Sequence, residues 1–187
     1  MDSVNTVGYS ALTPLNLLID AGCLMRDYGL ETEKIISATS GGNKFNVKID
    51  YRDIKCDGVK GDAKSLKKIV KVTVTLESNL LEATTETLAM MVFGDVDDTT
   101  NPDYDIITGR STILDSDYIT NVALIGTVSG NAKPIIIIVN NALSTDGLSL
   151  ETKDDDDNVL PVVWTGHIDP RTPSILPFEI RYPKVTV

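Results

Sequence analysis

The sequence predicts a mainly β protein, a β-sandwich or barrel of about eight strands with one flanking α-helix, a long basic hairpin and extended terminal arms. Short alternating or β-branched segments recur along its 187 residues, turn residues separate them, and a single segment has helical periodicity. The length fits one domain, residues 1–187. Within it, residues 1–14 form an N-terminal arm and residues 170–187 a C-terminal segment.

The first strand is expected in residues 15–28. This segment is apolar, and Gly22 would form a bend or bulge in the strand. A helix is the competing interpretation, because the hydrophobic residues of the segment also fit one helical face. We favour the strand.

A long hairpin follows. In residues 43–53 hydrophobic side chains alternate with polar ones, and residues 69–76 repeat this pattern with β-branched residues. Asp57, Gly58 and Gly61 supply the turn between them, since glycine adopts positive φ at no steric cost. The two segments therefore predict antiparallel strands joined by a basic loop.

A short helix comes next. Thr84 or Thr85 is suited to be its N-cap, and Leu88 and Met91 belong to one apolar face before Gly94 ends it. A loop is then expected in residues 95–103, and a charged turn in residues 154–157. Further strands are expected in residues 104–111, 118–128, 135–139, 148–152, 159–168 and 178–182.

Charge is distributed unevenly along the chain. Residues 44–71 hold nine Lys/Arg and four Asp/Glu, a net charge of +5, whereas the rest of the chain holds eight basic and 23 acidic residues, a net charge of −15. Two complementary surfaces on one protein would steer copies of it together. The alternative is an exposed hairpin whose lysines only discourage edge pairing.

The tip of this hairpin, residues 55–68, is expected to reach beyond the sandwich and contact an acidic surface of a neighbouring subunit. Arg52 is expected to be buried nearer the base. The run from Ile135 to Val139 predicts a strand that is buried on both faces or packed at an interface. The candidate interface residues are Arg52, Lys60, Lys64, Lys67, Lys68, Ile136 and Ile138.

Composition points away from several functional classes. A net charge of −10 argues against nucleic-acid binding, which needs clustered Lys/Arg. The only histidine, His167, has no nucleophile motif to serve, so we predict no enzyme, no catalytic residue and no cofactor. The acidic turn that begins at Asp154 lacks the glycine and glutamate of a calcium loop, and no metal site is predicted. No apolar run is long enough to cross a membrane.

Five blocks of the sequence carry a resemblance to a known family. They are ATSGGNKF (38–45), YRDIKCDGVKG (51–61), NLLEAT (79–84), PIIIIVNNAL (134–143) and LPVVWTGH (160–167). In the kinds of residues they contain and in their order along the chain, these blocks resemble the major tail protein, or tail tube protein, of long-tailed bacteriophages. The likeness extends from about residue 15 to residue 169.

The resemblance implies a β-sandwich with one flanking helix that assembles into hexameric rings. In this family, sheets of neighbouring subunits join into a barrel around a lumen, rings stack into a tube, and chain termini and a long hairpin carry contacts between rings. The implied partners are copies of the chain and other tail proteins, namely the tape measure, the tail terminator and the distal tail protein. The protein would be made in the host cytoplasm and end in the virion.

DNA would pass through the lumen without specific binding, and an acidic lining would keep it from adhering. Two alternatives remain open. One is the tube of a contractile tail or of an injection system. The other is a monomeric β-sandwich that binds a ligand.

Overall fold

A computed structural model describes residues 8–10, 12–62, 64–152, 154 and 158–184. Short 3-10 turns are η1 (Thr13–Leu15) and η2 (Asp115–Asp117), and the helix of the described residues is α1 (Thr85–Val92). The strands are β1 (Leu18–Arg26), β2 (Lys34–Ile35), β3 (Thr39–Asp53), β4 (Lys67–Leu80), β5 (Gly94–Asp97), β6 (Ile106–Gly109), β7 (Ile119–Val128), β8 (Ile135–Ser144), β9 (Leu160–Gly166) and β10 (Phe178–Arg181). The fold is mainly β, as the sequence predicts.

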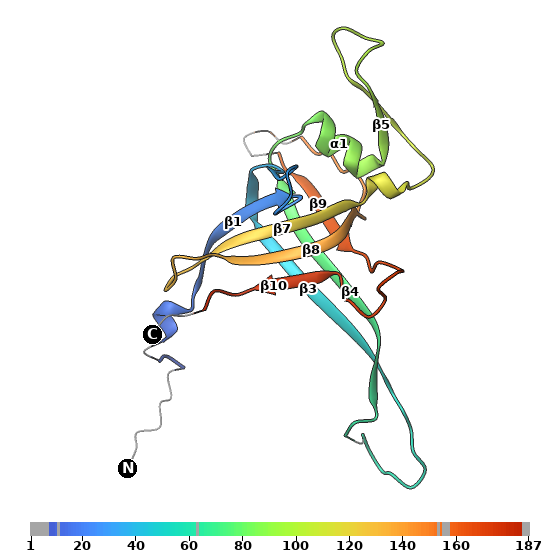
Figure 1. Ribbon diagram of the computed structural model, residues 1–187. Helices are drawn as coiled ribbons and strands as arrows, with labels where there is room; N and C mark the ends of the chain where they lie inside the picture. Colours follow the sequence, from blue (N-terminus) through green and yellow to red (C-terminus); the bar gives the residue numbers. More distant parts are fainter. Residues whose placement is uncertain (1–7, 11, 63, 153, 155–157, 185–187) are drawn as a thin grey trace.

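An eight-stranded antiparallel sheet forms the body of the molecule. Its order is β2-β1-β7-β8-β9-β4-β3, and β10 pairs with β8 beside this path. The sheet is folded so that β3 and β4 cross behind β1, β7, β8 and β10 (Figure 1). The space between the two halves is the core, where Leu24, Leu76, Val122, Val139 and Trp164 are all fully buried.

The fold turns its corner at β8. Residues Ile136–Val139 of β8 pair with β10, whereas only its last three residues pair with β9. Between these two sections Asn141 has a φ of +46°, and its side-chain amide donates to the carbonyl of His167 at 3.1 Å. Irregular residues of this kind allow a strand to pass from one layer to another. Because of this corner, β9, β4 and β3 cross the layer that β1, β7, β8 and β10 form.

β1 confirms the strand expected in residues 15–28 and its bulge. Its pairing with β7 shifts register between Ile19 and Cys23, and Gly22 has a φ of +80°. A Cβ atom at Gly22 would lie 2.9 Å from Cδ1 of Leu124 and 3.0 Å from the carbonyl oxygen of Ile125. Both the backbone angle and the close approach therefore require glycine.

α1 also matches its prediction. Thr84 is the N-cap, and its hydroxyl accepts from the backbone N–H of Thr87 while the Thr87 hydroxyl accepts from the Thr84 N–H. Met91 turns into the core, and Phe93 ends the helix in the left-handed conformation. This helix is not long and apolar enough to cross a membrane, and no other helix of the described residues is.

Two expectations for the later elements are wrong. Residues 95–103 are not a loop throughout, because β5 pairs with β6 from Gly94 to Asp97. Residues 148–152 alternate like a strand but form none, since no neighbouring strand pairs with them. Of the expected charged turn at 154–157, residues 155–157 lie outside the described residues, as do residues 1–7 and 11 of the N-terminal arm and 185–187 of the C-terminal segment.

Candidate assembly surface

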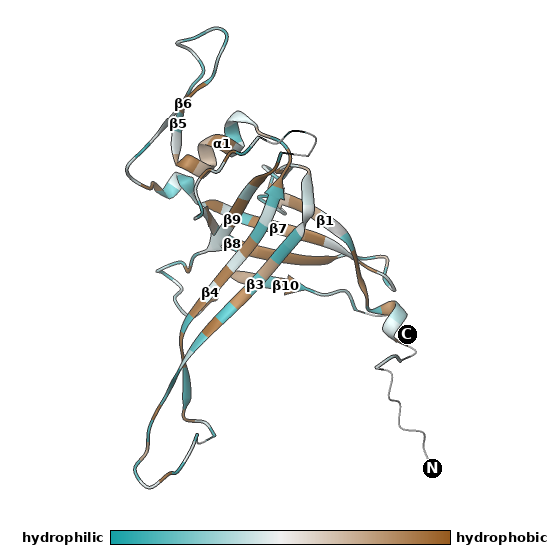
Figure 2. Ribbon diagram, turned by 180° about the vertical axis from the view of Figure 1, so that it is seen from behind, coloured by the Kyte–Doolittle hydropathy of each residue, from teal (hydrophilic) through white to brown (hydrophobic). Residues whose placement is uncertain are grey.

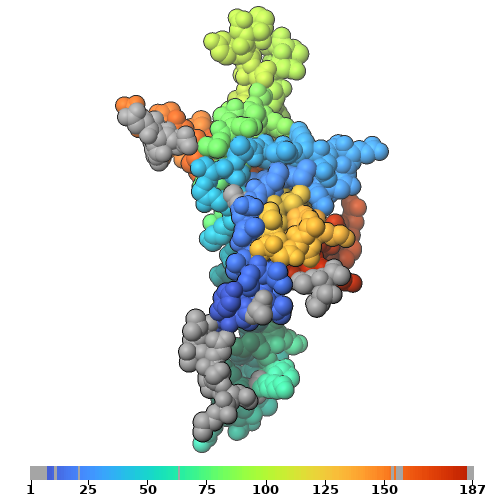
Figure 3. Space-filling view, turned by 90° about the vertical axis from the view of Figure 1, so that its left-hand side faces the viewer, coloured from blue at the N-terminus to red at the C-terminus, as the bar shows by residue number. Residues whose placement is uncertain are grey.

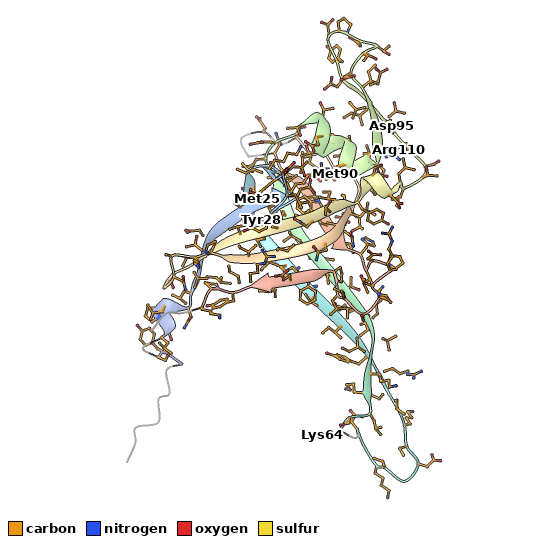
Figure 4. The ribbon with its side chains drawn as sticks, in the orientation of Figure 1. Met25, Tyr28, Lys64, Met90, Asp95 and Arg110 are labelled. Carbon is orange, nitrogen blue, oxygen red and sulfur yellow. The ribbon has the colours of Figure 1, made fainter. Side chains whose placement is uncertain are left out.

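The β3–β4 hairpin projects from the sheet and presents the predicted basic residues at one end of the molecule. Its two strands continue past the core to a loop in residues 54–66, and Lys64 lies near the tip (Figure 4). The expectation that Arg52 is buried is wrong, because Arg52 is exposed, as are all residues from 51 to 62. The basic residues exposed here are Arg52, Lys60, Lys64, Lys67 and Lys68.

The strand register concentrates positive charge on this hairpin. Arg52 lies directly opposite Lys68, and like charges in such a pair repel. Lys67, by contrast, has its Nζ 3.5 Å from a carboxylate oxygen of Asp53 and 5.7 Å from the centre of the Tyr51 ring. Within the described part of the chain, neither Arg52 nor Lys68 makes an ion pair. An anionic surface placed against this pair would therefore stabilise the hairpin.

The hairpin also carries an apolar stripe that its own chain covers only in part. Phe45 and Val47 pack against the core. Farther along β3, just past a register shift between Asp50 and Tyr51, Tyr51 lies opposite Ile69 of β4. These two side chains are 54% and 60% exposed. Figure 2 shows hydrophobic and hydrophilic residues alternating along both strands. The distal part of the stripe is thus an apolar surface flanked by cations.

The two isoleucines predicted from the apolar run lie elsewhere. β8 is an interior strand, with β7 on one side and β10 on the other along Ile136–Val139. Ile138 is 4% exposed, and Ile136 is half-buried. The structure therefore brings Ile138 into its own chain's interior, far from the basic hairpin, and leaves only Ile136 partly accessible.

A second two-stranded projection was missed by the sequence reasoning. The acidic arm, residues 94–109, consists of β5, β6 and the loop between them, and it contains five aspartates and no Lys or Arg. It projects at the end of the molecule opposite the basic hairpin, as the two views in Figures 1 and 3 agree. The density of aspartate around Asn101-Pro102 is the signal that could have found it, since this pair marks a turn between short apolar runs.

The carboxylates of the acidic arm are held in defined positions. Thr99 and Thr100 donate backbone and hydroxyl hydrogen bonds to Asp97, and the Thr100 hydroxyl contributes most to lowering its pKa far below the ordinary value. At the base, Nε of Arg110 lies 2.9 Å from Oδ1 of Asp95. Both residues are labelled in Figure 4. These hydrogen bonds therefore favour the charged form of Asp97.

A groove of about 390 Å³ lies beside α1, at the base of the acidic arm. Arg26 and Lys34 both pair with Glu86 there, and the hydrogen bond from Lys34 is the main cause of the lowered pKa of Glu86. Arg26 also pairs with Asp27, so the two cations and the two carboxylates of this cluster balance. No group of three or more His, Cys, Asp or Glu that could hold a metal occurs among the described residues.

Comparison of the sequence with protein-family models and with curated proteins finds no match. The surfaces above are therefore interpreted from their own chemistry. The basic hairpin and the acidic arm have one property in common, which is that both are exposed in the single chain.

Proposed function

We propose that this chain is a structural protein that binds copies of itself to form stacked rings, and that the resulting tube is the tail tube of a long-tailed bacteriophage. The observation that carries the proposal is the outer edge of β3. This strand has 15 residues and pairs only with β4 among the described strands. An exposed edge of that length presents a row of backbone donors and acceptors to any neighbouring strand.

A ring built from identical copies needs two unlike edges on each copy, because a head-to-tail contact joins different surfaces. The folded sheet offers the outer edge of β3 on one half and the outer edge of β10 on the other, since β10 pairs with β8 alone among the described strands. Pairing between such edges would continue the sheet from one copy to the next. Closure of the ring would then remove the edges that leave a single copy prone to aggregation.

The charge of the chain suits the proposed conduit. With a net charge of −10, a ring has enough carboxylates to line its lumen, while its lysines are concentrated on the basic hairpin. DNA affinity grows with the number of phosphates that Lys and Arg neutralise, so an acidic lining lets DNA pass without adhering. By the resemblance given above, six copies form each ring, and the tape measure, tail terminator and distal tail proteins contact the tube in the virion.

Sedimentation velocity over a range of protein concentrations tests the proposal, with thiol labelling as a second measure. Cys56 lies exposed in the hairpin loop, and Cys23 is half-buried in β1. We expect large species that grow with concentration, and slower maleimide labelling of Cys56 in them than in dilute protein. A single species of monomer mass at every concentration, with unchanged labelling, would contradict self-assembly.

A monomeric ligand-binding protein is the second candidate, and one observation favours it. A groove of about 580 Å³ runs between β4 and the end of β9, lined in part by Val70, His167 and Leu176, and its volume is in the range of small-molecule sites. This candidate predicts the single monomeric species described above. A tube of a contractile tail or injection system would instead assemble from the same edges, and differs in the sheath that surrounds it.

A further inference from the structure

The acidic arm contacts α1 at its base, but its loop extends away from the rest of the molecule. β5 and β6 form a sheet of their own, separate from the eight-stranded one. Their register places Asp95, Asp97 and Ile106 on one face of this sheet. Beyond that face, the loop carries Tyr104, which is 72% exposed. An isolated two-stranded hairpin is marginally stable in water unless its hydrophobic face is covered. The arm therefore presents two exposed apolar side chains, those of Tyr104 and Ile106, among its carboxylates.

The basic hairpin presents the matching surface. Its uncovered stripe, Tyr51 and Ile69, lies beside the repelling pair Arg52 and Lys68. The acidic arm has five aspartates, and the hairpin region 44–71 has a net charge of +5. Each projection thus combines exposed apolar side chains with a net charge, and the two net charges have opposite signs. Complementarity of this kind selects partners and fixes their register.

The two projections of one chain cannot meet each other, because they lie at opposite ends of the molecule (Figures 1 and 3). Two copies placed end to end would bring the acidic arm of one to the basic hairpin of the next. A contact between unlike surfaces of this kind does not close on two copies but repeats along an axis.

We infer that the acidic arm, residues 94–109, docks on the distal β3–β4 hairpin of a second copy of this chain and forms the contact between successive layers of the assembly. This inference rests on the proposed function and identifies the acidic arm as the surface that the hairpin contacts. The ring contact through the sheet edges is independent of it. Loss of the arm contact would leave separate rings, whereas loss of the edge contact would leave no rings.

Paired charge reversals test the contact. Asp98 and Asp103 are exposed, and their carboxylates make no hydrogen bond or ion pair with the described residues, so Asp98→Lys with Asp103→Lys changes charge without breaking a contact. On the hairpin, Lys60→Glu with Lys64→Glu likewise reverses the charge of two exposed residues. Each pair should raise the concentration at which stacks form by about tenfold or more, since each repels the unchanged partner surface. The chain with all four changes should regain stacking close to that of the wild type.

The matched control reverses two exposed acidic residues elsewhere, Glu31→Lys with Glu151→Lys, and should stack like the wild type. Melting temperatures identify any variant that fails to fold. The inference would be overturned if the chain with Asp98→Lys and Asp103→Lys formed stacks at the same concentration as the wild type. It would also be overturned if the chain with all four changes needed as high a concentration to stack as the chains with two changes. Rings that no longer stack would support both proposals, and a wild type that forms neither rings nor stacks would overturn both.

A disulfide provides a test that does not rely on charge. Cys56 is already exposed in the hairpin loop, and Thr108→Cys places a second thiol on the exposed face of β6. Mild oxidation of assembled protein should then give a ladder of covalent multimers, because each copy supplies one thiol to each neighbour. The control Ser174→Cys, exposed between β9 and β10, should give none. Equal ladders, or no ladder in assembled Thr108→Cys protein, would contradict the contact.

Discussion

At the scale of single residues, Asp117 and Arg110 fix the base of the acidic arm. Arg110 directly follows β6 and is mostly buried, and its guanidinium pairs with Asp117 of η2. Burial acts to raise the pKa of Asp117, but the backbone N–H of Leu114 and the guanidinium of Arg110 outweigh it, and the pKa is lowered below the ordinary 3.8. The carboxylate is therefore stabilised in its charged form by the fold.

We expect Asp117→Asn to lower the free energy of unfolding by about 1–3 kcal/mol at neutral pH, because it removes the more buried of the two carboxylates that pair with the Arg110 guanidinium and leaves only the exposed Asp95. A lowered folded pKa contributes stability above the unfolded pKa and loses it as pH falls through the folded value. The difference from the wild type should therefore shrink below about pH 4. Urea unfolding at pH 7 and pH 3 measures this, with exposed Asp115→Asn as the control; a difference independent of pH would contradict the assignment.

The isoleucines of β8 allow a second comparison. Ile138→Asp should prevent folding or cost several kcal/mol, because the buried carboxylate has no partner, whereas half-buried Ile136→Asp should cost less. Circular dichroism and melting temperature distinguish them. Equal melting temperatures for both variants and the wild type would show that this strand is not part of the core.

At the scale of elements, the bulge of β1 depends on one glycine, and the chain offers a matched control for it. Gly22 and Gly29 have φ values of +80° and +81°, but only Gly22 has atoms within 4 Å of the position that a Cβ would occupy. Replacement by alanine strains the backbone equally at both sites. Any larger loss of unfolding free energy at Gly22 than at Gly29 therefore measures the effect of the close approach of β1 to β7.

We expect Gly29→Ala to cost about 1 kcal/mol and Gly22→Ala to cost about 1–3 kcal/mol more, because the added methyl meets backbone as well as a side chain. Chemical unfolding of both variants measures the difference. Equal costs would mean that β7 moves aside freely, and that the bulge does not fix the register of the first strand pair.

Strong local patterns made these elements predictable. Alternation in residues 43–53, the Thr84 cap and the Gly22 bulge are local signals, and each led to the observed element. The strand expected at residues 148–152 failed because pairing needs a neighbour, which local alternation does not supply. The basic residues of the hairpin were found from charge alone. The acidic arm could not be found in this way, because its position opposite the hairpin depends on how the whole sheet folds.

At the scale of the whole molecule, the described chain consists of a folded sheet with an extended edge and two projections of opposite charge. The folded sheet encloses its own apolar core, in which Trp164 and its neighbours are fully buried. The outer edge of β3 has no partner strand among the described residues, and Tyr51 and Ile69 of the hairpin and Tyr104 of the acidic arm are exposed. Placing copies side by side and end to end would use each of these surfaces once.

The central claim is that identical copies associate both laterally and end to end. Negative-stain electron microscopy of the concentrated protein, with no other protein present, tests it most directly. The account predicts rings with a central hole at higher salt, where exposed ion pairs are screened, and stacked rings or tubes at low salt. Fields of separate, featureless particles of monomer size under both conditions would contradict it.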